Sequence, residues 1–266
     1  MLKDKNQKII IITGGLGLLG KQFAQTLIKD GHIPIILDKK KKAEIQKFKK
    51  KIYLKYAFEI DVYQLDITKE KNLINISKKI LKKYKKVDIL INNAANNPKV
   101  QKSRNSFKNS KLENFKVSAW DMDLKVGLTG SFLSAKCFGL IISKNNKGGS
   151  IINISSDLGI ISPDQRLYGK NDKKPVSYSV VKTGMLGLNK YLSTYWPSKV
   201  RSNALCFGGV LNNQNNVFLK KINKLIPMGR LAYPDEFNGI ISFLCSDNSS
   251  YLNGSVIPVD GGRTSW

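Results

Sequence analysis

The stretch TGGLGLLGKQ, Thr13–Gln22, follows a run of four isoleucines and decides the class of fold. Its glycines fit two kinds of nucleotide site. Residues 15–21 nearly complete the P-loop that binds a nucleoside triphosphate. A second spacing suits a dinucleotide whose pyrophosphate rests on a helix N-terminus. The glycines with this second spacing are Gly14, Gly17 and Gly20.

Residues around this loop favour the dinucleotide. A P-loop places Ser or Thr after its lysine to hold Mg²⁺, but Gln22 follows Lys21 here. A dinucleotide site instead needs an acid roughly 20 residues further on, to accept a hydrogen bond from a ribose 2′-hydroxyl. Asp38 fits that place, and its charge favours NAD over NADP. Lys39 and Lys40 offset the repulsion of a 2′-phosphate, so NADP stays open as the alternative.

Strand-like and helix-like segments alternate along the 266 residues. We expect strands at 7–15, 32–38, 62–67, 87–95, 148–156, 200–210 and 255–262. We expect helices at 18–31, 39–51, 71–84, 119–142, 176–196 and 234–246. This order predicts an α/β fold: a Rossmann-like doubly wound parallel sheet of about seven strands, with helices on both faces. Without an internal repeat or a long linker, residues 1–266 are expected to form a single NAD(P)-binding domain.

Two long polar stretches, 96–114 and 157–175, follow the fourth and fifth predicted strands. Ligands of such sheets bind beyond the carboxyl ends of the strands, so these stretches should form the rim of the site. Their basic residues include Lys99, Lys102, Arg104, Lys108, Arg166, Lys170, Lys173 and Lys174. A sugar phosphate or sugar nucleotide would be attracted there. The general excess of lysine is the alternative explanation.

The formal net charge of +26 has two interpretations. One is attraction to nucleic acid, anionic lipid or an acidic substrate. The other is a lysine-rich chain with solvated helix faces, as at 39–51 and 78–86, where apolar residues recur at helical spacing. Because no basic patch carries interleaved aromatic residues for base stacking, we favour the second and expect no nucleic-acid partner.

Cysteine, histidine and apolar content exclude further classes of protein. Three scattered cysteines argue against a disulfide framework and predict a cytoplasmic protein. No apolar run approaches the roughly 18 residues of a membrane helix, so no membrane partner is expected. The single histidine, His32, excludes a His-rich metal site and leaves a Ser-His-Asp triad only through a turn residue. No metal is expected.

The motif YSVVK places Tyr178 and Lys182 one turn apart on one face of a predicted helix. A free tyrosine has a pKa of about 10, so a phenolate at neutral pH costs roughly 4 kcal/mol. An ammonium about 4 Å away offsets a similar amount at an effective dielectric constant near 20. Lys182 is therefore expected to make Tyr178 a usable base. A chance pair on a helix surface would be the simpler explanation if the motif stood alone.

It does not stand alone, because the chain resembles the short-chain dehydrogenase/reductase family over nearly its whole length. The motifs of this resemblance are TGGLGLLG (13–20), Asp66-Ile67, NNAA (92–95), NISS (153–156), YSVVK (178–182), RSNALCFGGV (201–210), PMGRLAYPDEF (227–237) and YLNGSVIPVDGG (251–262). The narrower stretch 155–178 is similar to family proteins of bacterial surface-polysaccharide and flagellin-glycan pathways. The resemblance implies hydride transfer between a nicotinamide cofactor and the carbinol carbon of a substrate.

The resemblance also implies a role for each matching residue. Ser156 should hydrogen-bond the reacting oxygen, Tyr178 should exchange the proton with that oxygen, and Lys182 should bind the nicotinamide ribose. Residues implied to bind the cofactor, besides Tyr178 and Lys182, are Gly14, Gly17, Leu19, Gly20, Asp38, Asp66, Ile67, Asn93, Ala94, Gly208 and Val210. Asp66 and Ile67 should flank the adenine.

Three features depart from the family pattern. Gly127 stands where the family usually has an Asn that helps to hold a proton-relay water, so the relay should run through backbone, water or another residue. Phe207 stands where Pro is common, next to the expected nicotinamide. The stretch between Ser156 and Tyr178 is longer than in compact members, and this length resembles members that act on nucleotide-activated sugars.

We therefore expect an NAD(P)(H)-dependent oxidoreductase that interconverts an alcohol and a ketone. The expected substrate is a polar, carbohydrate-like or sugar-nucleotide molecule, with an anionic sugar derivative among the candidates. The alternatives are a compact reductase of an apolar or acyl substrate, and a cofactor-binding regulator with little turnover. Gly184 and Gly187 after the YSVVK motif, with the aromatic C-terminal Trp266, suggest a homodimer or homotetramer.

Overall fold

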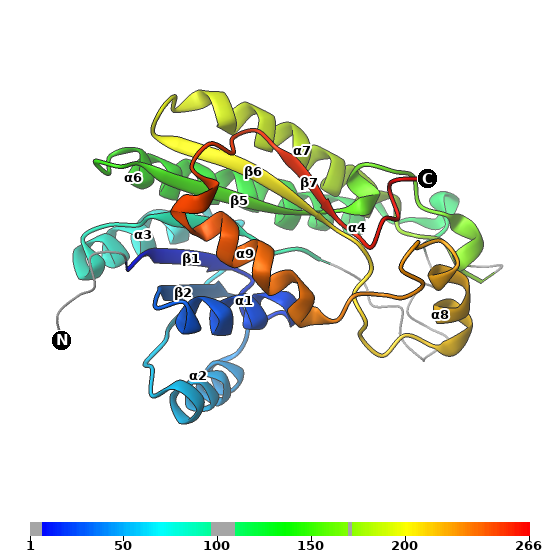
Figure 1. The fold of residues 1–266 in the computed structure, drawn as a ribbon, viewed down its shortest axis with the longest axis horizontal. Coiled ribbons are helices and arrows are strands. Elements are labelled where there is room, and N and C mark those ends of the chain that lie inside the picture. The colour runs from blue at the N-terminus through cyan, green and yellow to red at the C-terminus, as the bar shows by residue number, and fades with distance from the viewer. Residues whose placement is uncertain (1–6, 97–109, 170–171) are drawn as a thin grey trace.

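Seven parallel strands form one sheet in the order β3-β2-β1-β4-β5-β6-β7 (Figure 1). The computed structural model describes residues 7–96, 110–169 and 172–266. The strands are β1 (Ile9–Thr13), β2 (Ile33–Asp38), β3 (Asp61–Gln64), β4 (Ile89–Asn92), β5 (Gly149–Ser156), β6 (Val200–Phe207) and β7 (Val256–Val259). The order reverses direction between β1 and β4, which is where such sheets bind their ligands. The predicted doubly wound sheet is confirmed.

Helices cover both faces of this sheet (Figure 1). On one face, α1 (Leu18–Lys29), α2 (Lys42–Tyr56) and α9 (Asn238–Cys245) pack on Ile10 and Ile12 of β1. On the other face, Ile9 and Ile11 pack against α3 (Glu70–Tyr84), the helix at 117–143 and α7 (Val176–Tyr195). Because β1 is covered on both faces, its residues Ile9–Ile12 form a continuous apolar run rather than an alternating one.

The helix at 117–143 is continuous but changes its winding. It comprises α4 (Val117–Leu124), α5 (Gly130–Ser134) and α6 (Leu140–Ser143), joined by π-type turns at 125–129 and 135–139. Among the described residues it is the one helix long and apolar enough, by length and composition, to cross a membrane. Half of its apolar window is buried in the protein, with Leu133 and Phe138 packed toward the sheet. This burial is typical of a core helix.

The structure adds an element that the pattern did not predict. Helix α8 (Asn216–Asn223) follows β6, and its N-cap Asn215 accepts a hydrogen bond from the backbone N–H of Phe218 at 2.8 Å. The Asn before a short apolar run was the available signal. Inside α8, Ile222 packs with Leu167 and Leu231 in a small apolar cluster apart from the main core. Helix α8 therefore closes one side of the region beyond the sheet.

Candidate active site

A cavity of about 530 Å³ opens along the carboxyl ends of the strands. Its wall begins at the loop after β1, passes the ends of β2 and β4, and ends at β5, α7 and the segments after β6. Every site residue predicted from the sequence lines this cavity, with the exception of Gly20. The fold therefore brings together side chains that lie up to about 200 positions apart in the chain.

At one end of the cavity, the glycine loop passes from β1 into α1. Gly14 has a φ of +63°, and a Cβ there would lie 2.8 Å from the Cα of Ala94, so no larger residue fits without a shift. Gly17 is the N-cap of α1 and provides no side-chain cap, so the first turn keeps backbone N–H groups for an anion. Gly14, Gly17 and Leu19 all line the cavity, and this cradle suits a pyrophosphate.

Gly20 differs from the expectation, because it does not line the cavity. It is buried in α1, and a Cβ there would lie 2.6 Å from the Cα of Gly15. This glycine lets the helix approach the loop closely, which is a packing role, and its part in cofactor binding stays a prediction. The neighbouring Lys21 is exposed to solvent and is absent from the cavity wall, as expected if the loop is not a P-loop.

Asp38 ends β2 beside the glycine loop and is buried. Its carboxylate accepts hydrogen bonds from the backbone N–H of Leu16 at 2.8 Å and of Lys40 at 3.0 Å. These two bonds hold the acid in place and leave further lone pairs toward the cavity. Lys39 and Lys40 also line the cavity, but the ammonium of Lys40 pairs with Glu44 at 3.0 Å.

The middle of the cavity is built from the ends of β3 and β4. The side-chain amide of Asn93 donates to the carbonyls of Thr13 and Gly14, both at 3.0 Å, and ties β4 to the glycine loop. Asp66 accepts from the backbone N–H of Thr68 at 2.9 Å, and that bond helps to lower the pKa of Asp66 against its partial burial. Ile67 is buried beside Asp66. This arrangement offers an apolar and an acidic wall, and it fits an adenosine.

The three residues proposed for chemistry meet at the far end. Ser156 ends β5, and its hydroxyl donates to Asp157 at 2.6 Å. Tyr178 and Lys182 reach the same place from α7, where Nζ of Lys182 donates to the carbonyl of Ile154 at 2.8 Å. Lys182 Nζ lies 5.8 Å from the centroid of the Tyr178 ring.

The electrostatics of this cluster differ from the sequence-based expectation. Burial raises the pKa of Tyr178 to about 12, against a hydrogen bond with Ser156 that lowers it, and the charge of Asp157 raises it further. Burial also lowers the pKa of Lys182 to about 8, and the nearby ammonium of Lys174 acts in the same direction. With the chain's own groups alone, the phenol is therefore the dominant form at neutral pH and can donate its proton, and the expectation that Lys182 makes Tyr178 a usable base stays a prediction for the cofactor-bound protein.

Gly127 shows why the usual Asn is absent. The residue is buried in the first π-type turn, and a Cβ there would lie 2.3 Å from a methyl carbon of Val181. The space that an Asn side chain would need is filled by α7, next to the Tyr178–Lys182 motif. Val126, and not Gly127, lines the cavity. Phe207, which stands where the family commonly has Pro, packs against Phe237 at a ring-centroid distance of 4.1 Å. Its ring adds an aromatic side chain to the cavity wall.

The structure adds residues that sequence reasoning did not assign to the site. Asp157 and Arg263, which are 106 positions apart, form a buried ion pair at 3.1 Å that lines the cavity. The sequence places Lys174 only among the basic residues of a polar stretch, whereas in the structure its ammonium lies 3.6 Å from the centroid of the Tyr178 ring. The apolar part of the wall includes Leu167, Phe218, Ile222 and Leu231. No local pattern marks contacts of this kind.

The other predicted rim bases that the structure describes, Arg166 and Lys173, do not line the cavity. Arg166 is exposed and pairs with Asp164 at 2.8 Å, and Lys173 lies outside the cavity wall. The remaining bases, Lys99, Lys102, Arg104, Lys108 and Lys170, lie outside the described residues. The predicted basic rim is thus represented at the cavity by Lys174, within the part of the chain that the structure describes.

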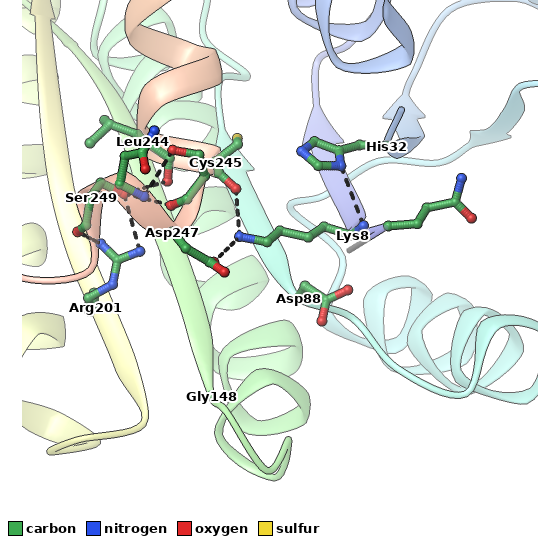
Figure 2. A network of polar contacts seen from close by, with 12 residues as sticks. Lys8, His32, Asp88, Gly148, Arg201, Leu244, Cys245, Asp247 and Ser249 are labelled. Carbon is green, nitrogen blue, oxygen red and sulfur yellow. Dashed lines mark hydrogen bonds and ion pairs between the residues drawn. The ribbon is translucent and has the colours of Figure 1, made fainter. Parts of the chain in front are cut away.

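His32 lies far from this site, at the amino ends of the strands (Figure 2). Its Nδ1 accepts from the backbone N–H of Lys8 at 3.5 Å, and burial followed by the charge of Lys8 lowers the pKa of His32. In residues 7–96, 110–169 and 172–266, no group of three or more His, Cys, Asp or Glu side chains is placed to hold a metal ion.

Comparison with known proteins agrees with this arrangement. The family model described as enoyl-(acyl carrier protein) reductase matches residues 18–264. The chain is 28% identical to the NAD-dependent glycerol dehydrogenase of Listeria innocua serovar 6a, over 98% of this chain and 96% of that protein. It is 27% identical to the post-translational flagellin modification protein A of Campylobacter coli, over 96% and 97% of the two chains. A solved NAD⁺-bound xylitol dehydrogenase superposes with a TM-score of 0.83 at 21% identity, covering 97% and 100% of the two chains.

Proposed function

This chain belongs to the short-chain dehydrogenase/reductase family and is an NAD(P)-dependent oxidoreductase acting on alcohols or their ketones; we propose that its substrate is a small, polar, carbohydrate-like molecule. The observation that carries the proposal is the wall around Tyr178. Ser156, Asp157 and Lys174 place polar groups beside the phenol, and Asn212 and Gln214 line the same cavity. Polar groups in such a chamber favour a substrate that can bond to them.

Ser156, Tyr178 and Lys182 each have a separate role in the proposed reaction. The hydroxyl of Ser156 lies at the end of β5, where it can donate to the substrate oxygen instead of to Asp157. Tyr178 gives its proton to that oxygen when a ketone is reduced, and takes it back when an alcohol is oxidised. Lys182 is held by the carbonyl of Ile154 and supplies positive charge near the phenol. When bound, the nicotinamide supplies or accepts the hydride.

A substrate panel with the variant Tyr178→Phe tests this proposal. Glycerol, mannitol and xylitol would be offered with NAD or NADP, and the appearance of reduced cofactor would be followed by absorbance. We expect turnover of at least one polyol, a loss of about 10²- to 10⁴-fold in Tyr178→Phe, and unchanged cofactor binding by thermal shift. Undiminished turnover in Tyr178→Phe would refute the role of the phenol. Cofactor binding without turnover of any substrate would favour the alternative that the protein is a cofactor-binding regulator.

NAD is the proposed preferred cofactor. The buried carboxylate of Asp38 lines the cavity beside the glycine loop, and it would repel the 2′-phosphate of an adenosine ribose bound there. The ammonium of Lys40 is engaged with Glu44, so it offers less compensation than the sequence suggested. The NAD-dependent glycerol dehydrogenase to which the chain is similar supports the same preference.

An acyl substrate is the second candidate, because one specific observation favours it. Leu167, Phe218, Ile222 and Leu231 give the cavity an apolar wall on the side of α8. The family whose model matches the chain is described as enoyl-(acyl carrier protein) reductase, whose name implies an acyl substrate. Oxidation of NADH by acetoacetyl-coenzyme A, faster than by any keto-sugar, would favour this candidate over the polar one.

We also propose that the chain works as a homo-oligomer. A Cβ added at Gly187 of α7 would meet nothing within 4 Å, so its side of the helix is open, whereas Gly184 packs on Leu128 of the same chain. Large apolar side chains are exposed on α7 and on the helix at 117–143, among them Tyr191, Tyr195 and Phe132. Light scattering at micromolar concentration should show a dimer or tetramer; a monomer alone would contradict the proposal.

A further inference from the structure

One positive charge beside the reacting phenol has no carboxylate of its own. Lys174 lies two residues before α7 and lines the cavity, with its ammonium 3.6 Å from the centroid of the Tyr178 ring. Among the ion pairs formed by residues 7–96, 110–169 and 172–266, none includes Lys174. A partly buried ammonium in this state is costly, because burial without a partner disfavours the charged form.

Asp157 is the acid whose charge acts on this lysine, but its oxygens already accept hydrogen bonds from other donors. One oxygen accepts from the hydroxyl of Ser156 at 2.6 Å and from the backbone N–H of Leu158 at 2.8 Å. The other oxygen accepts from the guanidinium of Arg263 at 3.1 Å. The charge of Asp157 raises the pKa of Lys174, but burial outweighs it and brings that pKa down to about 8. Asp157 is therefore the partner of Arg263 and not of Lys174.

The remaining charges at this end are also engaged. Asp164 lines the cavity and pairs with Arg166, which is largely exposed. Lys182 is buried and donates to the carbonyl of Ile154. Lys182 keeps further N–H donors, but among the described residues Lys174 is the charged group beside Tyr178 whose ammonium has neither an ion pair nor a hydrogen bond to a carbonyl, and at neutral pH it remains mostly protonated.

We propose that Lys174 binds a carboxylate of the substrate, so that the molecule oxidised or reduced is a hydroxy acid or keto acid. The inference rests on the proposed function and narrows its substrate class. Because the ammonium lies over the ring that carries the reacting hydroxyl, a carboxylate held there places a carbon of the same small molecule beside that hydroxyl. The carboxylate also supplies the negative charge that the lysine lacks.

A carboxylate suits the site better than a phosphate. One lysine balances a single negative charge, whereas a phosphate would bring nearly two charges into a wall that also contains Leu167, Phe218 and Ile222. Phosphate sites generally add an arginine fork or several backbone N–H groups. Arg263 is the arginine in the cavity wall, and it is already bonded to Asp157.

Matched pairs of acids and alcohols test the inference by binding, apart from turnover. The NADH-saturated protein would be titrated with lactate and 1,2-propanediol, glycerate and glycerol, and gluconate and glucitol, with inorganic phosphate as a further probe. Melting temperature would report binding, because a ligand of the native state raises it. We expect at least one acid to bind more tightly than its alcohol, and more tightly than phosphate.

Substitution of the lysine then separates its charge from its packing. In Lys174→Met the preference for the acid over its alcohol should fall about 10- to 100-fold, which is the size of a lost hydrogen bond to a charged group. Lys174→Arg should keep most of the preference. Lys173→Met is the matched control, because this adjacent lysine does not line the cavity, and it should behave as wild type.

Several results would overturn the inference. These are no acid preference in any pair, phosphate binding as tightly as the best acid, or an acid preference that survives in Lys174→Met. If Lys174→Met did not fold, Lys174→Gln would take its place in the same comparison. The proposed function fails on different data, namely undiminished turnover in Tyr178→Phe or no turnover of any substrate, so the two failures are distinguishable.

Discussion

Charged side chains at the amino ends of the strands have partners, whereas two lysines at the carboxyl ends form no ion pair among the described residues. At the amino ends, the charged side chains labelled in Figure 2 are all held by partners: Lys8 by Asp247 and a carbonyl, Asp88 by a backbone N–H and Lys86, and Arg201 by two carbonyls. At the carboxyl ends, Lys174 and Lys182 lie close together without an ion pair among the described residues.

The amino-end network joins segments that are distant in the sequence. The ammonium of Lys8 donates to the carbonyl of Cys245 at 2.9 Å and to Asp247 at 2.6 Å, across 237 and 239 positions. Arg201 of β6 donates to the carbonyls of Ser249 and Leu252 at 2.7 and 2.9 Å. These bonds fix the end of α9 against β1 and β6. Satisfied charges of this kind stabilise the fold and leave nothing for a ligand.

This difference in pairing indicates that ligands bind at the carboxyl ends of the strands. Buried groups with shifted pKa values and free donors gather at functional sites, where a ligand supplies the missing partner. At the carboxyl ends, burial brings the pKa of two lysines down to about 8 and that of one tyrosine up to about 12. These groups weaken the fold slightly and prepare the cavity for chemistry.

The same substitution at each end gives the sharpest test. Lys182→Met should lower turnover about 10²- to 10⁴-fold, since it removes one of the two positive charges near the phenol and the group expected to bind the nicotinamide ribose. Lys8→Met should leave turnover within about twofold, because it changes a network at the opposite end of the strands. Steady-state rates with the best polyol measure both. Similar losses in the two variants would break the contrast between the ends.

Stability against pH gives the next largest effect. Burial lowers the pKa of Lys174 to about 8, below its value near 10.4 in an unfolded chain. Between those values the unfolded chain binds more protons than the native protein, so the stability of the wild type rises with pH. The difference in pKa corresponds to about 3 kcal/mol at pH 7, and the lost contact of the ammonium with the Tyr178 ring offsets part of it. We therefore expect Lys174→Met to be more stable than the wild type at pH 7 by about 1–2 kcal/mol, with most of that gain gone by pH 10.

Urea midpoints at pH 7, 8.5 and 10 check this expectation, and Lys173→Met serves as the control. The sign of the change in stability decides the test, because replacing Lys174 at the carboxyl ends should stabilise the fold. A Lys174→Met variant less stable than wild type at pH 7 would show that the lysine has a partner in the folded chain.

Cofactor preference should respond to Asp38 by a smaller factor. Asp38→Ser removes the charge that opposes a 2′-phosphate and keeps a group that can accept from Leu16 N–H. The ratio of kcat/KM for NADP to that for NAD should rise about tenfold, as a charge interaction near 1.4 kcal/mol implies. An unchanged ratio would mean that Asp38 does not face the ribose.

The smallest effect is expected at the amino ends. Lys8→Met removes a donor to the carbonyl of Cys245 and an ion pair with Asp247, whose side chain is 87% exposed. The ion pair contributes little, so we expect a loss of about 0.5–1.5 kcal/mol, mainly from the carbonyl. Urea unfolding at neutral pH measures it. A gain in stability would remove the contrast with Lys174→Met.

The sequence predicted the class of fold because its signals are local. Isoleucine-rich strands and amphipathic helices alternate, and that order predicts a doubly wound sheet whatever the details of packing. The glycine loop, Asp38 and the YSVVK motif are likewise read within a few residues, and the fold brings them to one cavity. The sequence does not reveal the close packing of Gly20 on Gly15, because a glycine that touches a ligand and one that touches another glycine have the same letter.

The ion pairs, the packing and the pKa values of the site depend on tertiary structure and could not be predicted from the sequence. The ion pair of Asp157 with Arg263, the filling of the space beside Gly127 by Val181, and the apolar wall from α8 join residues far apart in the chain. The pKa of Tyr178 followed its burial more than its neighbour Lys182, since desolvation depends on everything packed around a group. Spacing along the chain determines which groups can meet, whereas packing determines which charges stay without a partner, and the substrate inferred for Lys174 depends on the second.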